Sequence, residues 1–364
     1  MRGAVLILAI ENFVLFGTLF ALGGFLLAWA ARTAALRDAW QPHPVTLART
    51  FTFSVVAPPL AALWLVAASL LPEAWLGHKV FDSIHTAQHD LHLLGLFTAR
   101  IEPTLAYATL LFVVSASAFA LWSSVRAHAR IGGIIKRLEM HAQPPSPDKV
   151  ALVERLAARH NLDVGLVMSD YPLSFMWGYT RSKLLLSSGL LNTLTAEELA
   201  GVLEHEAAHH ARRDNLIKLI LAVSSRLSLI FPLTRLVLLW RNEQVELICD
   251  EVAAPLTSSP LEVASALVKV RRGSPVSSYS PIVTAPGVSG FLASDTHSFE
   301  RRVHRLLAFT DVLLTPAHGI RLSQPPIGVA LAVSFIFIFS LALLSLLTPF
   351  TVHWAAESII QIIS

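Results

Sequence analysis

Residues Thr195–Asn215 read TAEELAGVLEHEAAHHARRDN, and this stretch decides the class of fold. Thr195 can cap the start of a helix, and Glu198 three residues later completes a capping box. Leu199 and Val202 then continue an apolar stripe at helical spacing. The stretch therefore predicts an amphipathic helix with a defined N-terminus.

The predicted helix carries the sequence HEAAH at His205–His209, which is the HExxH pattern. Residues four apart share one face of a helix, so the imidazoles of His205 and His209 can converge on one metal ion. Glu206 can reach a water on that ion and take its proton as the water attacks a peptide carbonyl. The pattern predicts one catalytic zinc ion per chain, with Glu206 as the general base.

A second helical segment, Arg241–Ala254, offers the third protein ligand that catalytic zinc usually takes. It reads RNEQVELICDEVAA, in which Glu246 and Asp250 are four apart and share a face. We predict that Glu246 binds zinc and that Asp250 accepts the N–H of a ligand imidazole, which fixes its tautomer. The competing third ligands are Glu243, Glu251 and Asp214, with Cys249 as a softer candidate on another face.

The composition indicates a membrane protein with a polar insert. Of 364 residues, 54% are hydrophobic and only 15% are charged, whereas about a quarter are charged in a soluble globular protein. The net charge of +3 is too small to favour nucleic acid as a partner, so we expect no direct nucleic-acid binding. The single cysteine, Cys249, excludes an intramolecular disulfide framework.

Four apolar stretches are long enough to cross a bilayer, which takes about 20 residues as a helix. They cover residues 4–31, 51–71, 104–124 and 327–349. The apolar segment Leu216–Trp240 is interrupted by Pro232 and by basic residues. As a fifth span it would put the second helical segment across the membrane from the first. We predict that it forms a helical hairpin lying on the bilayer surface.

The distribution of Lys and Arg gives the orientation. Basic residues outnumber acidic ones in the loop 32–50, at the start of the long insert and before the last span, but not in the loop 72–103. The positive-inside rule then places both termini outside and the insert in the cytoplasm. The predicted fold is an α-helical protein of the inner (cytoplasmic) membrane with four transmembrane helices. It comprises a membrane domain at 1–124, an inserted α+β zincin metalloprotease domain at 125–326, and a fourth span with a short extracellular tail at 327–364.

Other segments add candidate groups. The run KLLLSS at Lys183–Ser188 is expected to be an edge strand that binds extended substrate by strand addition. After the Ser-, Pro- and Gly-rich loop 272–298, His297 or an arginine of the next helix can stabilise the oxyanion; contact with the membrane surface is the alternative for the arginines. The histidines of the outer loop 73–102 are candidates for metal binding or pH sensing, and Glu11 in the first span is a candidate functional group. We expect instead that the histidines lie on a solvated helix and that Glu11 lies near a membrane interface.

These features resemble the BlaR/MecR-type membrane metallopeptidases, the gluzincin sensor-transducers of bacterial antibiotic resistance. The order of spans, HExxH domain, ExxxD helix and last span is similar over nearly the whole chain, and Asp214 follows His209 by five residues. The resemblance implies that His205, His209 and Glu246 bind zinc in a gluzincin domain. Glu206 would be catalytic. Asp214, like Asp250, would contact the zinc ligands without binding zinc itself.

The same resemblance implies regulated proteolysis, typically of a cytoplasmic transcriptional repressor. Autocleavage within residues 273–298 is a further implication. Those sensors carry an extracellular penicillin-binding domain after the fourth span, and this chain ends shortly after residue 349, so we expect no covalent β-lactam sensor here.

The segment Tyr171–Ala208 also resembles the HtpX and CAAX-protease gluzincins, with Gly178 before the strand, a GLL turn and the HExxH helix. Their Thr-His-Pro-Pro motif is only partly present, because Ser298 and Phe299 replace the prolines; it would make His297 the oxyanion residue. This second reading implies membrane-protein quality control. Three predicted spans before HExxH favour the signalling reading. A scaffold with structural zinc is disfavoured, because such sites normally have four protein ligands, including thiolates.

Overall fold

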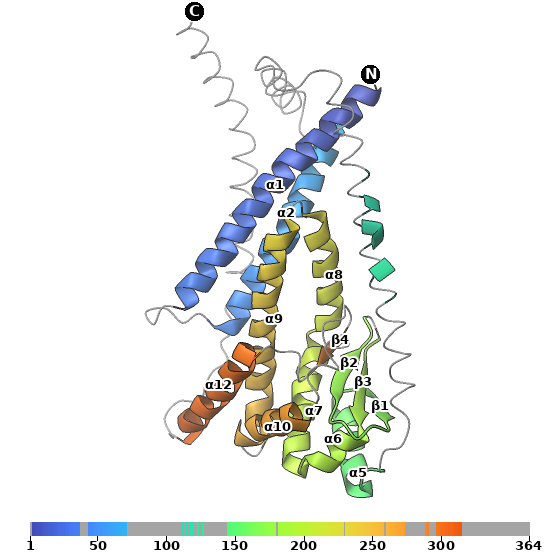
Figure 1. Ribbon diagram of the computed structural model, residues 1–364, viewed down its shortest axis with the longest axis vertical. Coiled ribbons are helices and arrows are strands. Elements are labelled where there is room, and N and C mark those ends of the chain that lie inside the picture. The colour runs from blue at the N-terminus through green and yellow to red at the C-terminus, as the bar shows by residue number, and fades with distance from the viewer. Residues whose placement is uncertain are drawn as a thin grey trace, which may run out of the picture.

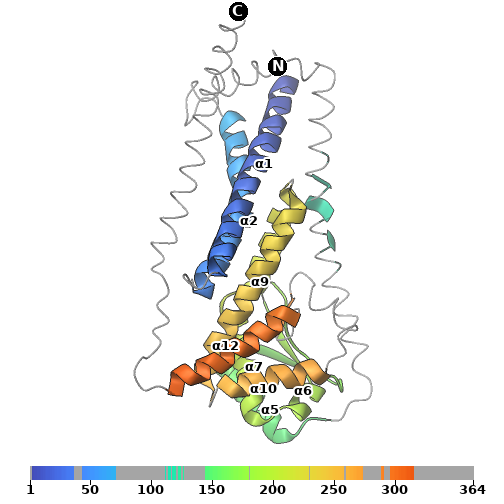
Figure 2. The same cartoon turned by 60° about the vertical axis from the view of Figure 1, so that its left-hand side comes forward.

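Two long helices stand on a mixed helical and β-sheet domain, as Figures 1 and 2 show. The computed structural model describes residues 2–36, 43–70, 144–179, 181–228, 230–257, 260–273, 288–290 and 296–314, with isolated positions between 111 and 126. The predicted spans 104–124 and 327–349 lie outside these residues, apart from those isolated positions, which are helical.

The two long helices are α1 (Arg2–Ala35) and α2 (Pro44–Leu70), which lie side by side. Within them, Gly17–Ala35 and Pro44–Leu63 are long and apolar enough to cross a membrane. The helices meet closely at Gly24, where a Cβ atom would lie 2.5 Å from the carbonyl oxygen of Ser54. Pro58 has no N–H to donate to that carbonyl, so the glycine faces an oxygen without its usual helical donor.

The apolar hairpin consists of α8 (Asp214–Leu227) and α9 (Phe231–Ala253). It runs along α1 and α2 and does not lie flat beneath them (Figures 1 and 2), so the predicted orientation was wrong. Its apolar side chains are buried against the long helices, in a cluster that includes Leu221, Val237 and Phe51. Hydrophobicity showed that these residues avoid water, but the helices that cover them are distant in sequence.

A four-stranded sheet lies beside the HExxH helix. Its strands are β1 (Asp163–Val167), β2 (Ser174–Trp177), β3 (Lys183–Ser187) and β4 (Val288–Gly290), in the order β1-β3-β2-β4. β3 pairs parallel with β1 and antiparallel with β2, and β2 pairs antiparallel with β4. The predicted edge strand is therefore a central strand. Its unbroken run of buried leucines is typical of a strand with neighbours on both sides and both faces covered.

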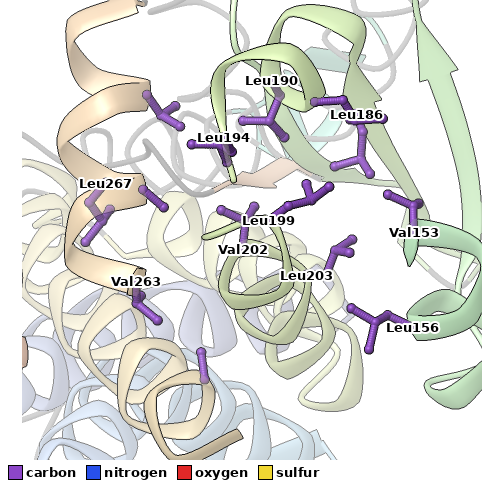
Figure 3. Packing of buried hydrophobic residues seen from close by; sticks show 14 of the residues in the cluster. Val153, Leu156, Leu186, Leu190, Leu194, Leu199, Val202, Leu203, Val263 and Leu267 are labelled. Atoms are coloured by element: carbon purple, nitrogen blue, oxygen red, sulfur yellow. The ribbon is translucent and has the colours of Figure 1, made fainter. Parts of the chain in front are cut away.

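The domain core is formed where the remaining helices surround α7 (Ala196–Ala211). In Figure 3, Leu199, Val202 and Leu203 of α7 point into a cluster that also contains Leu190 and Leu267. The surrounding elements are α5 (Pro147–Arg159), α6 (Ser188–Thr193), the 3-10 turn η1 (Ala254–Leu256), α10 (Pro260–Gly273) and α12 (Thr296–Leu314). Anchoring α7 by its apolar side fixes the direction of its histidine face.

The predicted capping box is present at the start of α7. The Glu198 backbone N–H donates to Thr195 Oγ1 at 3.2 Å, and the Thr195 backbone N–H donates to Glu198 Oε2 at 2.8 Å. The same carboxylate accepts hydrogen bonds from Ser265 Oγ at 2.5 Å and Lys269 Nζ at 2.8 Å. Burial by itself raises the pKa of a carboxyl group, but these donors hold the pKa of Glu198 below its ordinary value of 4.5.

Glu198→Gln is expected to destabilise the domain by about 1–3 kcal/mol at neutral pH, because it removes a charge-assisted contact with Lys269. A carboxyl whose pKa is lowered on folding stabilises the fold above its unfolded-state pKa, and that contribution is lost as pH falls through the lower, folded-state value. The melting temperatures of the two proteins should therefore differ at pH 7 and converge below pH 4.5. An equal difference at every pH would contradict this account.

Candidate active site

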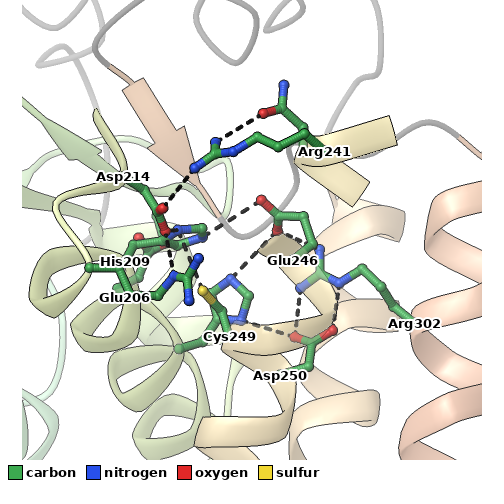
Figure 4. Close-up of polar contacts among 12 residues, drawn as sticks. Glu206, His209, Asp214, Arg241, Glu246, Cys249, Asp250 and Arg302 are labelled. Carbon is green, nitrogen blue, oxygen red and sulfur yellow. Dashed lines mark hydrogen bonds and ion pairs between the residues drawn. The ribbon is translucent and has the colours of Figure 1, made fainter. Parts of the chain in front are cut away.

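The two histidines of the HExxH helix are buried and face a carboxylate of α9. His205 and His209 are at most 1% exposed, and their ring centroids lie 4.9 Å apart. Nε2 of His205 lies 3.6 Å from Glu246 Oε2, and Nε2 of His209 lies 3.6 Å from Glu246 Oε1. Figure 4 shows Glu246 reaching from its own helix toward His209. The structure thus brings together the three residues that the sequence predicted as ligands.

These distances suit a shared metal ion better than direct hydrogen bonds. A nitrogen–oxygen distance of 3.6 Å is too long for a hydrogen bond. Two ligands of a tetrahedral zinc ion, each bonded at about 2.0–2.1 Å, stand about 3.4 Å apart. Nε2 of His209 is buried without a hydrogen-bond partner in the described part of the chain. Two imidazoles and a carboxylate are also a usual donor set for zinc, so the residues fit this ion.

Two aspartates hold the other nitrogen of each imidazole. Nδ1 of His205 lies 2.9 Å from Asp250 Oδ1, and Nδ1 of His209 lies 2.9 Å from Asp214 Oδ2. These contacts favour the tautomer with the proton on Nδ1, which directs the lone pair of Nε2 toward Glu246. Burial alone would lower the pKa of His205, but the neighbouring carboxylates of Asp250 and Glu246 raise the pKa to about 9.

Glu206 lies beside the histidines and is completely buried. Its Oε1 accepts a hydrogen bond of 2.9 Å from the hydroxyl of Ser174, the first residue of β2. Burial raises the pKa of Glu206 above its ordinary value, against the opposing charges of His209 and His205. A raised pKa brings a carboxylate closer to the range in which a general base works at neutral pH. No motif in the sequence marked Ser174.

Arg302 of α12 is the second residue that the sequence analysis did not single out. It is fully buried, and its Nε and Nη2 donate to the two carboxylate oxygens of Asp250 at 2.7 and 2.8 Å. Its Nη1 lies 3.1 Å from Glu246 Oε2. The sequence analysis assigned the arginines of this helix to the oxyanion or the membrane surface, whereas Arg302 contacts two carboxylates of the site (Figure 4).

The competing ligands have other partners. Glu243 pairs with Arg32 at 3.0 Å and with Arg301, and Glu251 pairs with Arg305 and with His43. Asp214 faces Nδ1 of His209, and it also accepts from Arg241 at 3.2 Å. These contacts turn the three carboxylates away from the Nε2 atoms.

Cys249 remains the nearest alternative ligand. Its sulfur and one nitrogen of each of the two histidines all lie within 4.8 Å of one another. However, the sulfur contacts Nδ1 of His209, at 3.5 Å, which is the nitrogen that Asp214 occupies. Glu246, in contrast, faces Nε2 of both histidines, the nitrogens that the aspartates leave free for a metal. Glu246 is the better third donor.

For several candidates the structure describes no side chain. His297 is the second residue of α12, and Glu11 lies within α1, but the side chains of both are not described. The histidines of the outer loop 73–102 are also outside the described residues. Of the loop 273–298, the structure describes its first residue, β4 and the first turn of α12.

Comparison with known proteins gives the family. The model of peptidase family M48 matches residues 149–274. A protease HtpX homolog of Acidiphilium cryptum is 30% identical over an alignment of 205 positions, which covers 45% of this chain and 69% of that protein. Homologs from Pyrobaculum calidifontis and Gemmatimonas aurantiaca are 31% and 25% identical, over 36% and 46% of this chain and 38% and 71% of their own lengths. The chain therefore belongs to peptidase family M48, a family of zinc metalloproteases, and is itself a metalloprotease.

Proposed function

We propose that the chain is a zinc-dependent endopeptidase that hydrolyses peptide bonds of membrane or membrane-proximal proteins, in the manner of an HtpX-like quality-control protease. His205, His209 and Glu246 would hold one zinc ion, with Glu206 as the general base. The observation that carries the proposal is the convergence of both Nε2 atoms on Glu246 at 3.6 Å, next to buried Glu206.

The residues around the site would each have a defined task. Zinc, when bound, lowers the pKa of water and polarises a carbonyl group. Glu206 accepts the proton of the attacking water and passes it to the leaving amine, while Ser174 holds Oε1 of this carboxylate in place. Asp250 and Asp214 keep the imidazoles in one tautomer and orientation. His297 remains a candidate for stabilising the oxyanion.

Substrate binding is proposed along the side of β2 that faces away from β3, where β4 pairs with it in this structure. This strand contacts α7, and its first residue touches Glu206. An extended peptide that took the place of β4 could pair with β2 through backbone hydrogen bonds. β4 takes the antiparallel position beside β2, in the register Phe175–Gly290 to Trp177–Val288. β4 belongs to the loop 273–298, and autocleavage in this loop is part of the proposal.

The HtpX-like reading is preferred over repressor cleavage. The relatives found are HtpX homologs, and they give repressor cleavage no support over this alternative. The argument for a signalling protease depended on a third span before HExxH, and the predicted span 104–124 is largely outside the described residues. A structural zinc site is disfavoured, because buried Glu206 stands where a base is needed and no thiolate set surrounds the histidines among the described residues.

We propose an inner-membrane location with both termini outside and the catalytic domain in the cytoplasm. The support is the apolar length of α1 and α2 together with the positive loop 32–50. The lipid bilayer is then a constant partner.

The test is cleavage of β-casein, an unstructured protein, by the full chain purified in detergent and loaded with zinc. We expect fragments with new termini, detectable by mass spectrometry, which disappear when 1,10-phenanthroline removes the metal and return when zinc is restored. Glu206→Gln is the matched control against a contaminating protease. Intact β-casein after prolonged incubation with zinc-loaded chain would contradict the proposal. Detection of only full-length chain in active preparations would contradict autocleavage.

A further inference from the structure

Three arginines of α12 contact the acidic residues of α9, and we call Arg301, Arg302 and Arg305 the arginine clasp. The two outer members pair with carboxylates beside the site: Arg301 with Glu243, and Arg305 with Glu251. These arginines are 40% and 45% exposed, whereas Arg302 between them is completely buried. Figure 2 shows α12 crossing α9 at this level. The middle arginine is therefore in a different environment from its neighbours.

Arg302 contacts the two carboxylates that lie against the imidazole of His205. Its fork grips the two oxygens of Asp250 at 2.7 and 2.8 Å, and its remaining nitrogen lies 3.1 Å from Glu246 Oε2. Asp250 in turn holds Nδ1 of His205, and Glu246 faces Nε2 of the same ring. One rigid, planar group thus fixes the separation and rotation of two carboxylates that approach opposite sides of one imidazole.

We propose that Arg302 is a positioning residue that holds Glu246 and Asp250 in the geometry required to bind zinc. This inference rests on the zinc site proposed above. It assigns the α12 helix a part in the metal centre, although the sequence separates Arg302 from Asp250 by 52 residues.

A second role for Arg302, simple neutralisation of the acidic cluster, has the opposite consequence for zinc affinity. A fixed positive charge close to a cation site opposes binding by Coulomb repulsion. If charge were its only contribution, removing Arg302 would tighten zinc binding, and lysine would replace it without loss. If the fork positions the carboxylates, both changes weaken binding, because a lysine ammonium cannot make the bidentate contact.

The experiment is a competition titration of zinc against a chromophoric chelator, using metal-free full-length chain in detergent. The variants are Arg302→Lys, Arg302→Met and the matched control Arg305→Met, which removes a clasp arginine whose partner, Glu251, does not face the histidines. We expect the zinc dissociation constant to rise about 10–100-fold in both Arg302 variants, the range for loss of a group that supports a metal ligand. Arg305→Met should bind zinc as the wild type does.

The outcomes separate the two levels of the argument. Wild-type affinity in Arg302→Lys, or tighter binding in Arg302→Met, would overturn the positioning role and leave the zinc site intact. No zinc binding by the wild type would overturn the proposed function and this inference together. Near-UV circular dichroism and the melting temperature of each metal-free variant measure folding independently, so affinity is compared per folded chain. The conservative Arg302→Lys change keeps the test decisive if Arg302→Met does not fold.

Discussion

Glu206→Gln is expected to reduce kcat/KM for peptide hydrolysis by about 100-fold to 10,000-fold while leaving one zinc ion per chain. The amide has nearly the same shape as the carboxylate and can still bond to Ser174, but it cannot accept a proton from water. Because Glu206 is not one of the residues whose atoms converge as ligands, metal content should not change. Hydrolysis of a fluorogenic peptide and elemental analysis of the same preparation measure the two quantities.

Glu204→Gln is the matched control for this change. Glu204 lies on the same helix two residues earlier and is also buried, but it pairs with His160 and Arg159 on the other side of α7. It should retain both hydrolysis and zinc. Wild-type activity in Glu206→Gln would remove the general base from the mechanism. Equal loss in both variants would indicate damage to α7, not to catalysis.

Glu246→Ala is expected to weaken zinc binding by more than about 100-fold, beyond the range for residues that only support a ligand. The change removes a carboxylate whose two oxygens each face one of the Nε2 atoms. Arg302 keeps its two hydrogen bonds to Asp250, so its charge is not left unpaired. Zinc per chain after dialysis, measured by elemental analysis, should fall from about one to nearly none, and hydrolysis should be lost with it.

The carboxylate of Glu243 provides the control, since it lies one turn away on the same helix and pairs with Arg32 and Arg301. Glu243→Ala should keep normal zinc content. Full zinc occupancy in Glu246→Ala would assign the third ligand to another group, and the double variant with Cys249→Ser would then test the thiol that lies near His209.

The parts of the site that could be predicted are those set by short-range spacing. HExxH and the Glu246–Asp250 pair each depend on residues four apart on one helix, and the structure brings both pairs to the same place. Ser174 and Arg302 could not be predicted in this way. Their partners are 32 and 52 residues away, and no local pattern encodes which strand end or which arginine reaches the carboxylates.

The errors in the fold have a similar origin. The apolar run in β3 was correctly identified as a strand, but its place between β1 and β2 depends on pairing with segments before it in the chain. The hairpin of α8 and α9 was correctly expected, but its direction depends on Phe51 and other residues of α2. In both cases the sequence indicates that the segment is buried, but the tertiary fold decides which elements pack against it.

Two carboxylates of α9, Glu243 and Glu251, each have two basic partners, one from α12 and one from the region of the long helices α1 and α2. Glu243 is paired with Arg32 of α1 and Arg301 of α12, and Glu251 is paired with His43, just before α2, and Arg305 of α12. Loss of the contact from Arg32 or from His43 therefore leaves each carboxylate still paired with an arginine of α12, so no buried charge is left unpaired. Substitution of Arg32 or His43 is therefore expected to leave the domain around α7 stable.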